Sequence, residues 1–173
     1  PVVHTEKMDS EYKARGFLTV TGRITIEPVA FIVCHLPSRF AGSYYREVGA
    51  AQAKLVKDSL LRVNKDCKVF VMGDMNDDPN NRSMAEELRG KAEIEEVDKG
   101  DMYNPWYNIL VKQGTGTLMY QGAWNLFDQI LVTPNLINKK GSKDYRDLKY
   151  LKCEIQRMPY LFQTEGQYKG STK

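Results

Sequence analysis

The chain has 173 residues, 42% of them hydrophobic, which is enough to bury one core, so we expect a single domain over residues 1–173. Its 25 basic and 22 acidic side chains leave a formal net charge of +3, which excludes the strongly basic composition that by itself indicates nucleic-acid binding. No apolar run reaches the roughly 18 residues that cross a bilayer, so the sequence predicts no transmembrane segment.

The cysteines and the first residues bear on the compartment. Cys34, Cys67 and Cys153 are odd in number and lack the spacing of a metal site, so we expect buried, free thiols. The chain starts at Pro1 and shows no charged start followed by an apolar run. The compartment therefore stays unknown: we expect a soluble protein, secreted or periplasmic if a signal peptide was removed.

The first predicted elements form a strand, helix, strand unit. Residues 29–34 and 68–72 are continuous apolar runs bounded by polar residues, which indicates two buried central strands. Between them, apolar residues recur near helical spacing over 45–63, with Ser43 as the expected N-cap. A connection of this length permits a crossover, so we expect the strands to be parallel or near neighbours, with the helix on one face of the sheet.

The second half of the chain is less regular. Residues 77–81 have the composition of a turn, and residues 82–89 indicate a short helix that ends at Gly90. Residues 102–124 are rich in glycine and aromatic side chains, which predicts a long surface loop. A third strand is expected over residues 125–132, ended by the Thr-Pro pair that follows.

Polar side chains gather where the first two predicted strands end. His35 and Arg39 come at the end of the first strand, and Asp74 and Asn76 come at the end of the second. Open α/β sheets bind ligands at the carboxyl ends of their strands, so these residues are candidates for one site. Asp74 and Asn76 lie two residues apart on one side of the chain, where a carboxylate and an amide can hold water and a phosphate oxygen beside Mg²⁺.

Each of these residues also has an ordinary structural interpretation. Gly-Asp-x-Asn after a strand is often only an acidic turn, a single histidine at a strand end is often structural, and a loop arginine is often a solvated charge. An EF-hand is a further alternative, because Asp74, Asn76 and Asp78 match its first three ligand positions. It fails because Pro79 replaces the required glycine and Ala85 replaces the bidentate glutamate.

Three motifs follow one another along the chain. They are His-x-Pro-Ser-Arg from residue 35, Val-Phe-Val-Met-Gly-Asp-Met-Asn-Asp from residue 69 and Trp-Asn-Leu-Phe-Asp-Gln-Ile from residue 124. Together they resemble the endonuclease/exonuclease/phosphatase superfamily, whose best-known member is pancreatic deoxyribonuclease. The resemblance covers residues 17–134 and continues more loosely to residue 173. It implies an α/β fold, a four-layer sandwich in which two β-sheets pack face to face with helices outside.

The resemblance implies a divalent-metal-dependent hydrolase of phosphate esters, of the phosphodiesterase, nuclease or phosphatase type. By position, Asp74 would position or activate the attacking water, Asn76 would orient the water and the phosphate, and His35 would contact the phosphate. Arg39 would be a further phosphate contact, and Asp128 would orient a catalytic histidine. The implied cofactor is Mg²⁺, or Mn²⁺ or Ca²⁺, which spreads the charge of the phosphate together with cationic donors.

The chain also departs from the pattern of the family. His4 and His35 are its only histidines, so the final Ser-Asp-His motif is absent. Also missing is the N-terminal part with the glutamate that is the principal metal ligand of the family. We therefore expect an incomplete domain over residues 1–173, its C-terminal half, with no certain metal ligand. Such a fragment is expected to be inactive alone and to pair with the remaining half of the domain or with itself.

The sequence leaves the substrate and one alternative function open. The family includes nucleases, sphingomyelinases and inositol phosphatases, so the expected partner is a phosphate ester, either in a nucleic acid or in a phospholipid headgroup. The alternative is a non-catalytic binding domain that retains the fold, with Trp106 and Tyr107 of the aromatic loop on its binding surface. A glutamate upstream and a Ser-Asp-His downstream in the full-length gene would favour the enzyme.

Overall fold

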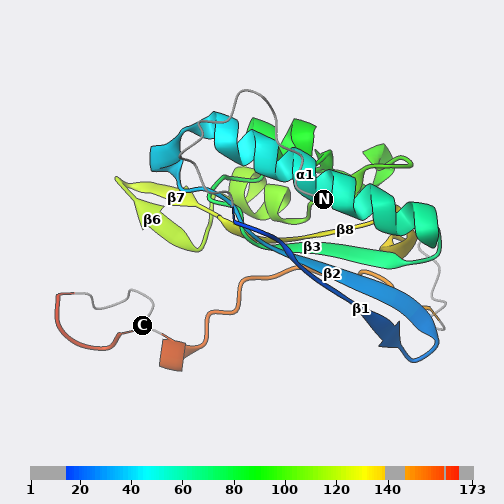
Figure 1. The fold of residues 1–173 in the computed structure, drawn as a ribbon. Coiled ribbons are helices and arrows are strands. Elements are labelled where there is room, and N and C mark those ends of the chain that lie inside the picture. The colour runs from blue at the N-terminus through cyan, green and yellow to red at the C-terminus, as the bar shows by residue number, and fades with distance from the viewer. Residues whose placement is uncertain (1–14, 139–146, 162, 168–173) are drawn as a thin grey trace.

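The computed structural model describes residues 15–138, 147–161 and 163–167. Six strands form one sheet in the order β1-β2-β3-β8-β5-β4, and helix α1 (Ser43–Val63) lies along one face of it (Figure 1). The mixed α/β class predicted from the sequence is confirmed.

Strands β2 (Glu27–His35) and β3 (Lys68–Asp74) pair in parallel, and α1 is the crossover between them. This confirms the predicted strand, helix, strand unit. The helix begins at Ser43 itself, and Gly42, with a positive φ of 91°, occupies the N-cap position. Ser43 is therefore not the N-cap that the sequence predicts, because glycine adopts this backbone conformation without a Cβ clash.

One face of the sheet packs against α1 and forms the main core. Alternate residues of β2 and β3 point toward the helix, because side chains alternate between the two faces of a strand. Ala50 and Ala53 of the helix are 1% exposed, and their small side chains allow a close approach to the strands. The fully buried strand residues on this face are Ala30, Ile32, Val69 and Val71.

The opposite face of the sheet, here called the open face, is only partly covered. β1 (Leu18–Ile24) extends it as an antiparallel edge strand. On this face Phe31 stacks on Phe70 with ring centroids 4.9 Å apart, and Val33 is 37% exposed. The prediction that both central strands are fully buried is therefore wrong for the open face, which no helix or second large sheet covers among the described residues.

A smaller apolar cluster covers one part of the open face. Leu148 and Tyr150, from the C-terminal segment, pack there against Tyr103 and Val132. The rings of Tyr103 and Tyr150 meet edge to face with centroids 5.1 Å apart. The backbone N–H of Leu148 also donates to the Glu27 carboxylate at 2.6 Å. The described C-terminal segment is thereby attached to the sheet at its β8 and β5 side and at the start of β2.

The elements that follow β3 correct one predicted boundary. The predicted short helix is a π-helical turn, η2 (Ser83–Glu87). Arg89, with a φ of 60°, adopts the left-handed conformation expected of Gly90, and Gly90 instead begins strand β4 (Gly90–Lys91). Glycine is required there for another reason, because a Cβ on Gly90 would lie 2.9 Å from the Met84 carbonyl oxygen.

The predicted surface loop over residues 102–124 contains regular elements. Strand β5 (Met102–Tyr103) is buried in the sheet, and a π-helical turn, η4 (Asn108–Lys112), follows it. Strand β6 (Leu118–Tyr120) begins a separate two-stranded sheet. The loop prediction is wrong at these positions because strands of two or three residues are too short to show an alternating pattern.

The predicted strand over residues 125–132 is divided into two. Its first residue ends β7 (Ala123–Asn125), which pairs with β6 in a hairpin that projects from the sheet in Figure 1. Leu126 and Phe127 lie in neither strand, and the remaining residues form β8 (Asp128–Val132), which is antiparallel to β3 and ends before the Thr-Pro pair, as predicted. Short 3-10 helices complete the described structure: η1 (Arg39–Ala41), η3 (Ile94–Glu96), η5 (Pro134–Leu136) and η6 (Pro159–Leu161).

The described residues form one large sheet and the helical layer on it, which are two of the four layers of the expected sandwich. All three cysteines are free; Cys34 and Cys67 are buried as predicted, whereas Cys153 is only half-buried. Over the part of the chain that the structure describes, no helix has the length and apolar character needed to cross a membrane.

Candidate active site

Three of the predicted site residues lie side by side at one end of the sheet. His35, the last residue of β2, pairs in register with Asp74, the last residue of β3. Asp74 in turn pairs with Asp128, the first residue of the antiparallel strand β8. All three side chains belong to the open face, since their strand neighbours Cys34 and Gln129 are buried toward the helix side.

His35 and Asp74 form an accessible pair. The Nε2 atom of His35 lies 3.7 Å from Oδ2 of Asp74, and the two side chains are 53% and 37% exposed. Asp128 differs in its electrostatics, because partial desolvation and the neighbouring charge of Asp74 raise the pKa of its carboxyl group, while His35 opposes the shift. Two carboxylates placed this close together favour a shared proton or a bound cation. Because their side chains are partly exposed, His35 and Asp74 are accessible from solvent.

Asn76 is held in a tight turn directly after β3. Its φ of 51° is a left-handed conformation that asparagine tolerates better than most residues. Its backbone N–H donates to Oδ1 of Asp74 at 2.9 Å, and its side-chain Nδ2 donates to the Leu36 carbonyl at 2.8 Å. The structure thus brings Asn76 together with His35, Asp74 and Asp128.

Arg39 lies next to this group, but its donors face other parts of the protein. Its guanidinium donates to the Asn76 carbonyl at 3.2 Å, to Oδ2 of Asp78 at 2.9 Å and to Oδ1 of Asn125 at 3.1 Å. It also lies over the Phe127 ring, 4.4 Å from the centroid. The side chain remains 43% exposed. A role of Arg39 as a phosphate contact stays a prediction.

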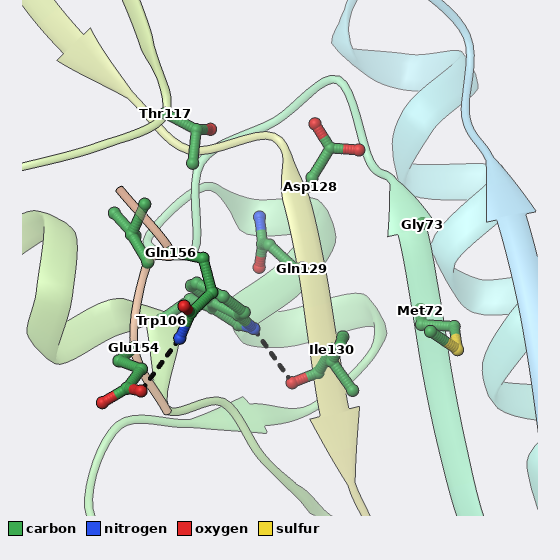
Figure 2. Close-up of a pocket in the computed structure, with 10 residues that line it drawn as sticks. Met72, Gly73, Trp106, Thr117, Asp128, Gln129, Ile130, Glu154 and Gln156 are labelled. Carbon is green, nitrogen blue, oxygen red and sulfur yellow. Dashed lines mark hydrogen bonds between the residues drawn. The ribbon is translucent and has the colours of Figure 1, made fainter. Parts of the chain in front are cut away.

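A pocket of about 390 Å³ opens beside Asp128 (Figure 2). Trp106 and Ile130 form apolar walls, and the Nε1 of Trp106 donates to the Ile130 carbonyl at 3.1 Å, which fixes the indole ring along β8. Glu154 and Gln156 from the C-terminal segment line another side and are hydrogen-bonded to each other at 2.9 Å. The aromatic loop that the sequence suggested as a binding surface therefore borders the candidate site.

A profile of the endonuclease/exonuclease/phosphatase family matches residues 2–173, nearly the whole chain. The chain belongs to the endonuclease/exonuclease/phosphatase family. The superfamily expected from the three sequence motifs is thereby confirmed. A search of curated proteins finds no significant match to this family member.

Three solved structures are similar to this family member at low identity. The catalytic domain of human Nocturnin with bound sulfate is 13% identical, with a TM-score of 0.46 over 66% of this chain and 39% of that chain. Sphingomyelinase C from Streptomyces griseocarneus is 16% identical, with a TM-score of 0.46 over 72% of this chain and 44% of that chain. A mutant beta toxin from Staphylococcus aureus with bound magnesium ions is 17% identical, with a TM-score of 0.41 over 69% of this chain and 42% of that chain. The chain spans less than half the length of each.

The described residues of this family member offer only part of a metal site. They include no group of three or more His, Cys, Asp or Glu side chains arranged to hold a metal ion. Asp74 and Asp128 are adjacent carboxylates, and Mg²⁺ commonly takes one or two protein carboxylates with oxygens of water and substrate. The described residues therefore fit Mg²⁺ as contributors to a ligand set that other residues would complete.

Sequence reasoning missed two residues that support the turn containing Asn76. Asp77 and Arg46 are each 6% exposed at the side chain, with Oδ1 of Asp77 2.8 Å from Nε of Arg46. Ser83 donates its hydroxyl to the other carboxylate oxygen at 2.6 Å. The only local signal was an acidic residue after Asn76, which a solvated turn explains equally well. Arg46 lies on α1, so no short spacing in the sequence links it to the turn.

Proposed function

We propose that the full-length protein is a divalent-metal-dependent hydrolase of phosphate esters. The observation that supports this most is the grouping of His35, Asp74 and Asp128 at one end of the open face in a member of this family. Asn76 is hydrogen-bonded to Asp74 in the turn that follows β3. A phosphate anion repels hydroxide, so hydrolysis needs hydrogen-bond donors or cations at the phosphate and a carboxylate that readies the attacking water. The grouping contains both kinds of side chain.

The geometry suggests a role for each residue. Asp74 receives the Asn76 N–H on one carboxylate oxygen and acts with the other as the base toward the attacking water. Asn76 orients the water and the scissile phosphate through its amide. His35, which is half exposed beside Asp74, donates a hydrogen bond to a phosphate oxygen. Asp128 orients a catalytic histidine that this chain does not contain.

The proposed cofactor is Mg²⁺, with Mn²⁺ or Ca²⁺ as alternatives. When bound, it supplies positive charge that stabilises the phosphate as negative charge develops on it. A glutamate from outside this chain would be its principal ligand, and the neighbouring carboxylates of Asp74 and Asp128 would add negative charge beside it. Because the principal glutamate and the Ser-Asp-His motif implied by the family resemblance are missing from this sequence, we expect residues 1–173 to be inactive alone. The substrate class is a phosphodiester or phosphomonoester, in a nucleic acid or in a phospholipid headgroup.

The substitution Asp74→Asn in the full-length protein tests this proposal. The change conserves shape, so the fold should persist, while the rate of hydrolysis of bis(p-nitrophenyl) phosphate with Mg²⁺ should fall roughly a hundredfold or more. Asp66→Asn, at an exposed position in the turn between α1 and β3, is the matched control and should retain the wild-type rate. Wild-type turnover by Asp74→Asn would refute the role of Asp74.

The same assay separates the enzyme from the alternative, a non-catalytic binding domain. Wild-type full-length protein is tested with a phosphomonoester, a nucleic acid and a phospholipid. Hydrolysis of one of them, lost on chelation of divalent metal, supports the enzyme. Absence of hydrolysis of all three would favour the binding domain, for which the pocket beside Trp106 is the candidate surface.

A further inference from the structure

We propose that Arg39 is a positioning residue that holds Asn76 and Asp128 in place for hydrolysis, and that it does not bind the phosphate itself. The inference rests on the proposed function. It differs from the role that family resemblance alone assigns to Arg39. Two chain segments are involved: residues 75–81, which contain Asn76 and are called the Asn76 loop, and residues 125–127, which precede Asp128.

Arg39 binds the Asn76 loop at three points. Its Nε donates to the carbonyl of Asn76 at 3.2 Å, so it contacts the proposed catalytic residue through the backbone. Its Nη2 donates to Oδ2 of Asp78 at 2.9 Å and to Oδ1 of Asn81 at 3.3 Å. The same Asn81 oxygen accepts the backbone N–H of Asp78 at 2.7 Å. The guanidinium is therefore part of the hydrogen-bond network that closes the loop.

Arg39 also binds the segment before Asp128. Its remaining terminal nitrogen, Nη1, donates to Oδ1 of Asn125 at 3.1 Å, and Asn125 is 8% exposed. The guanidinium carbon lies 4.4 Å from the centroid of the Phe127 ring, and Phe127 is bonded directly to Asp128. A planar guanidinium with donors on three nitrogens can make these contacts at once, whereas a lysine ammonium cannot.

The two segments are joined where Arg39 lies. The N–H of Leu126 donates to Oδ1 of Asp78 at 2.7 Å, and the N–H of Met75 donates to the Phe127 carbonyl at 2.8 Å. These bonds connect the same two segments that the guanidinium connects. Loss of Arg39 should therefore loosen both segments together.

The charges around Arg39 disfavour a phosphate on its guanidinium. Besides Asp78 at 2.9 Å, the carboxylate of Asp77 lies 3.8 Å from its Nε. Asp77 also pairs with Arg46 at 2.8 Å, so the two carboxylates and the two guanidiniums of this cluster already balance one another. A phosphate would have to displace one of the carboxylates or share the Arg39 guanidinium with it, at a cost in electrostatic energy.

Arg39→Lys and Asp78→Asn in the full-length protein distinguish positioning from phosphate binding. In Asp78→Asn, the side-chain amide oxygen can still accept the Leu126 N–H, but the charged acceptor for Arg39 is lost. For positioning, both variants should lower kcat for bis(p-nitrophenyl) phosphate by roughly tenfold to a hundredfold, with KM within about twofold of wild type. Arg82→Lys, in an exposed ion pair, is the control and should leave both constants unchanged.

A raised KM in Arg39→Lys with unchanged kcat in Asp78→Asn would overturn the inference in favour of a phosphate contact. Hydrogen exchange provides a readout that does not depend on turnover. The amides of Leu126 and Met75 should exchange faster in Arg39→Lys than in wild type, and unchanged exchange would overturn the link between the segments. Absence of any wild-type hydrolysis would overturn the proposed function and the positioning role in catalysis with it, while faster exchange would still support the link.

Discussion

The buried ion pair of Arg46 and Asp77 holds the turn that contains Asn76. Their side chains are 6% exposed and 2.8 Å apart, although the Nε–H is directed too far off line for a hydrogen bond, so the contact is ionic. Asp77→Ala leaves the buried Arg46 charge without its partner and should lower the free energy of unfolding of the full-length protein by about 3–5 kcal/mol. Urea denaturation measures this change.

An exposed pair is the control for that prediction. Arg82 and Glu86 are 62% and 66% exposed and 2.9 Å apart. Glu86→Ala should change the free energy of unfolding by less than about 1 kcal/mol, because solvent screens the pair. Equal losses in the two variants would contradict the assignment of Asp77 as a buried structural charge.

Asp128 gives a prediction on pH and stability. Desolvation and the charge of Asp74 raise its pKa in the folded state above the ordinary 3.8. At pH values between 3.8 and this raised pKa, the folded state therefore binds more protons than the unfolded state. The contribution of Asp128 to stability therefore decreases as the pH rises from 3.8 through its folded-state pKa. Asp128→Asn lacks this loss, so its stability relative to wild type should increase over the same pH range.

Urea unfolding of the full-length protein at several pH values tests this expectation. Asp128 is exposed at its side chain, so solvent screening makes the expected change small. Asp66→Asn, at an exposed position in the turn between α1 and β3, is the control variant. A stability difference for Asp128→Asn that stays constant with pH would contradict the raised pKa.

Among the elements, the β2 and β3 pair depends on Gly73. Gly73 has a φ of 132°, and a Cβ there would lie 2.0 Å from the Cys34 carbonyl oxygen. Gly73→Ala should therefore separate the strands where His35 and Asp74 pair, and lower the free energy of unfolding by about 3 kcal/mol or more. Thermal unfolding of the full-length protein measures the loss.

Gly22 in β1 is the matched control for this strand pair. A Cβ on Gly22 meets no atom within 4 Å, so Gly22→Ala should change stability by less than about 1 kcal/mol. A Gly73→Ala variant as stable as Gly22→Ala would show that the strands can separate without cost, which would contradict the close approach as the reason for glycine.

On the scale of the whole molecule, the open face predicts association. Leu18, Val20 and Ile130 on this face are 62%, 49% and 39% exposed. Each Å² of apolar surface removed from water contributes about 25 cal/mol, so covering several hundred Å² stabilises by many kcal/mol. A protein limited to residues 1–173 should therefore aggregate, pair with another copy or require the remaining half of the domain.

Light scattering on that protein tests the prediction. Association that increases with concentration, and a monomer recovered on coexpression with the remaining half, are the expected results. A dilute monomer with a sharp cooperative melt would contradict it, because the core would then be complete without another layer.

The central strands, the crossover helix and the family could be predicted from the sequence. β2 and β3 are continuous apolar runs, α1 has helical periodicity, and the candidate site residues lie in short motifs at strand ends. These are local patterns, because a strand or helix shows its buried face in the spacing of its own residues. The sequence also predicts that His35 and Asp74 lie close together, because parallel strands bring their carboxyl ends to one edge of the sheet.

Only the tertiary structure decided how the rest of the site is supported. Arg39 meets partners 37 and 86 residues away, and Asp77 meets an arginine on α1, so no spacing in the sequence relates them. For the same reason the division of β7 from β8 escaped prediction, because each strand is set by the partner with which it pairs. Sequence alone determined which side chains are candidates for the chemistry; long-range contacts determined which of them lie together on the open face and which bind the Asn76 loop.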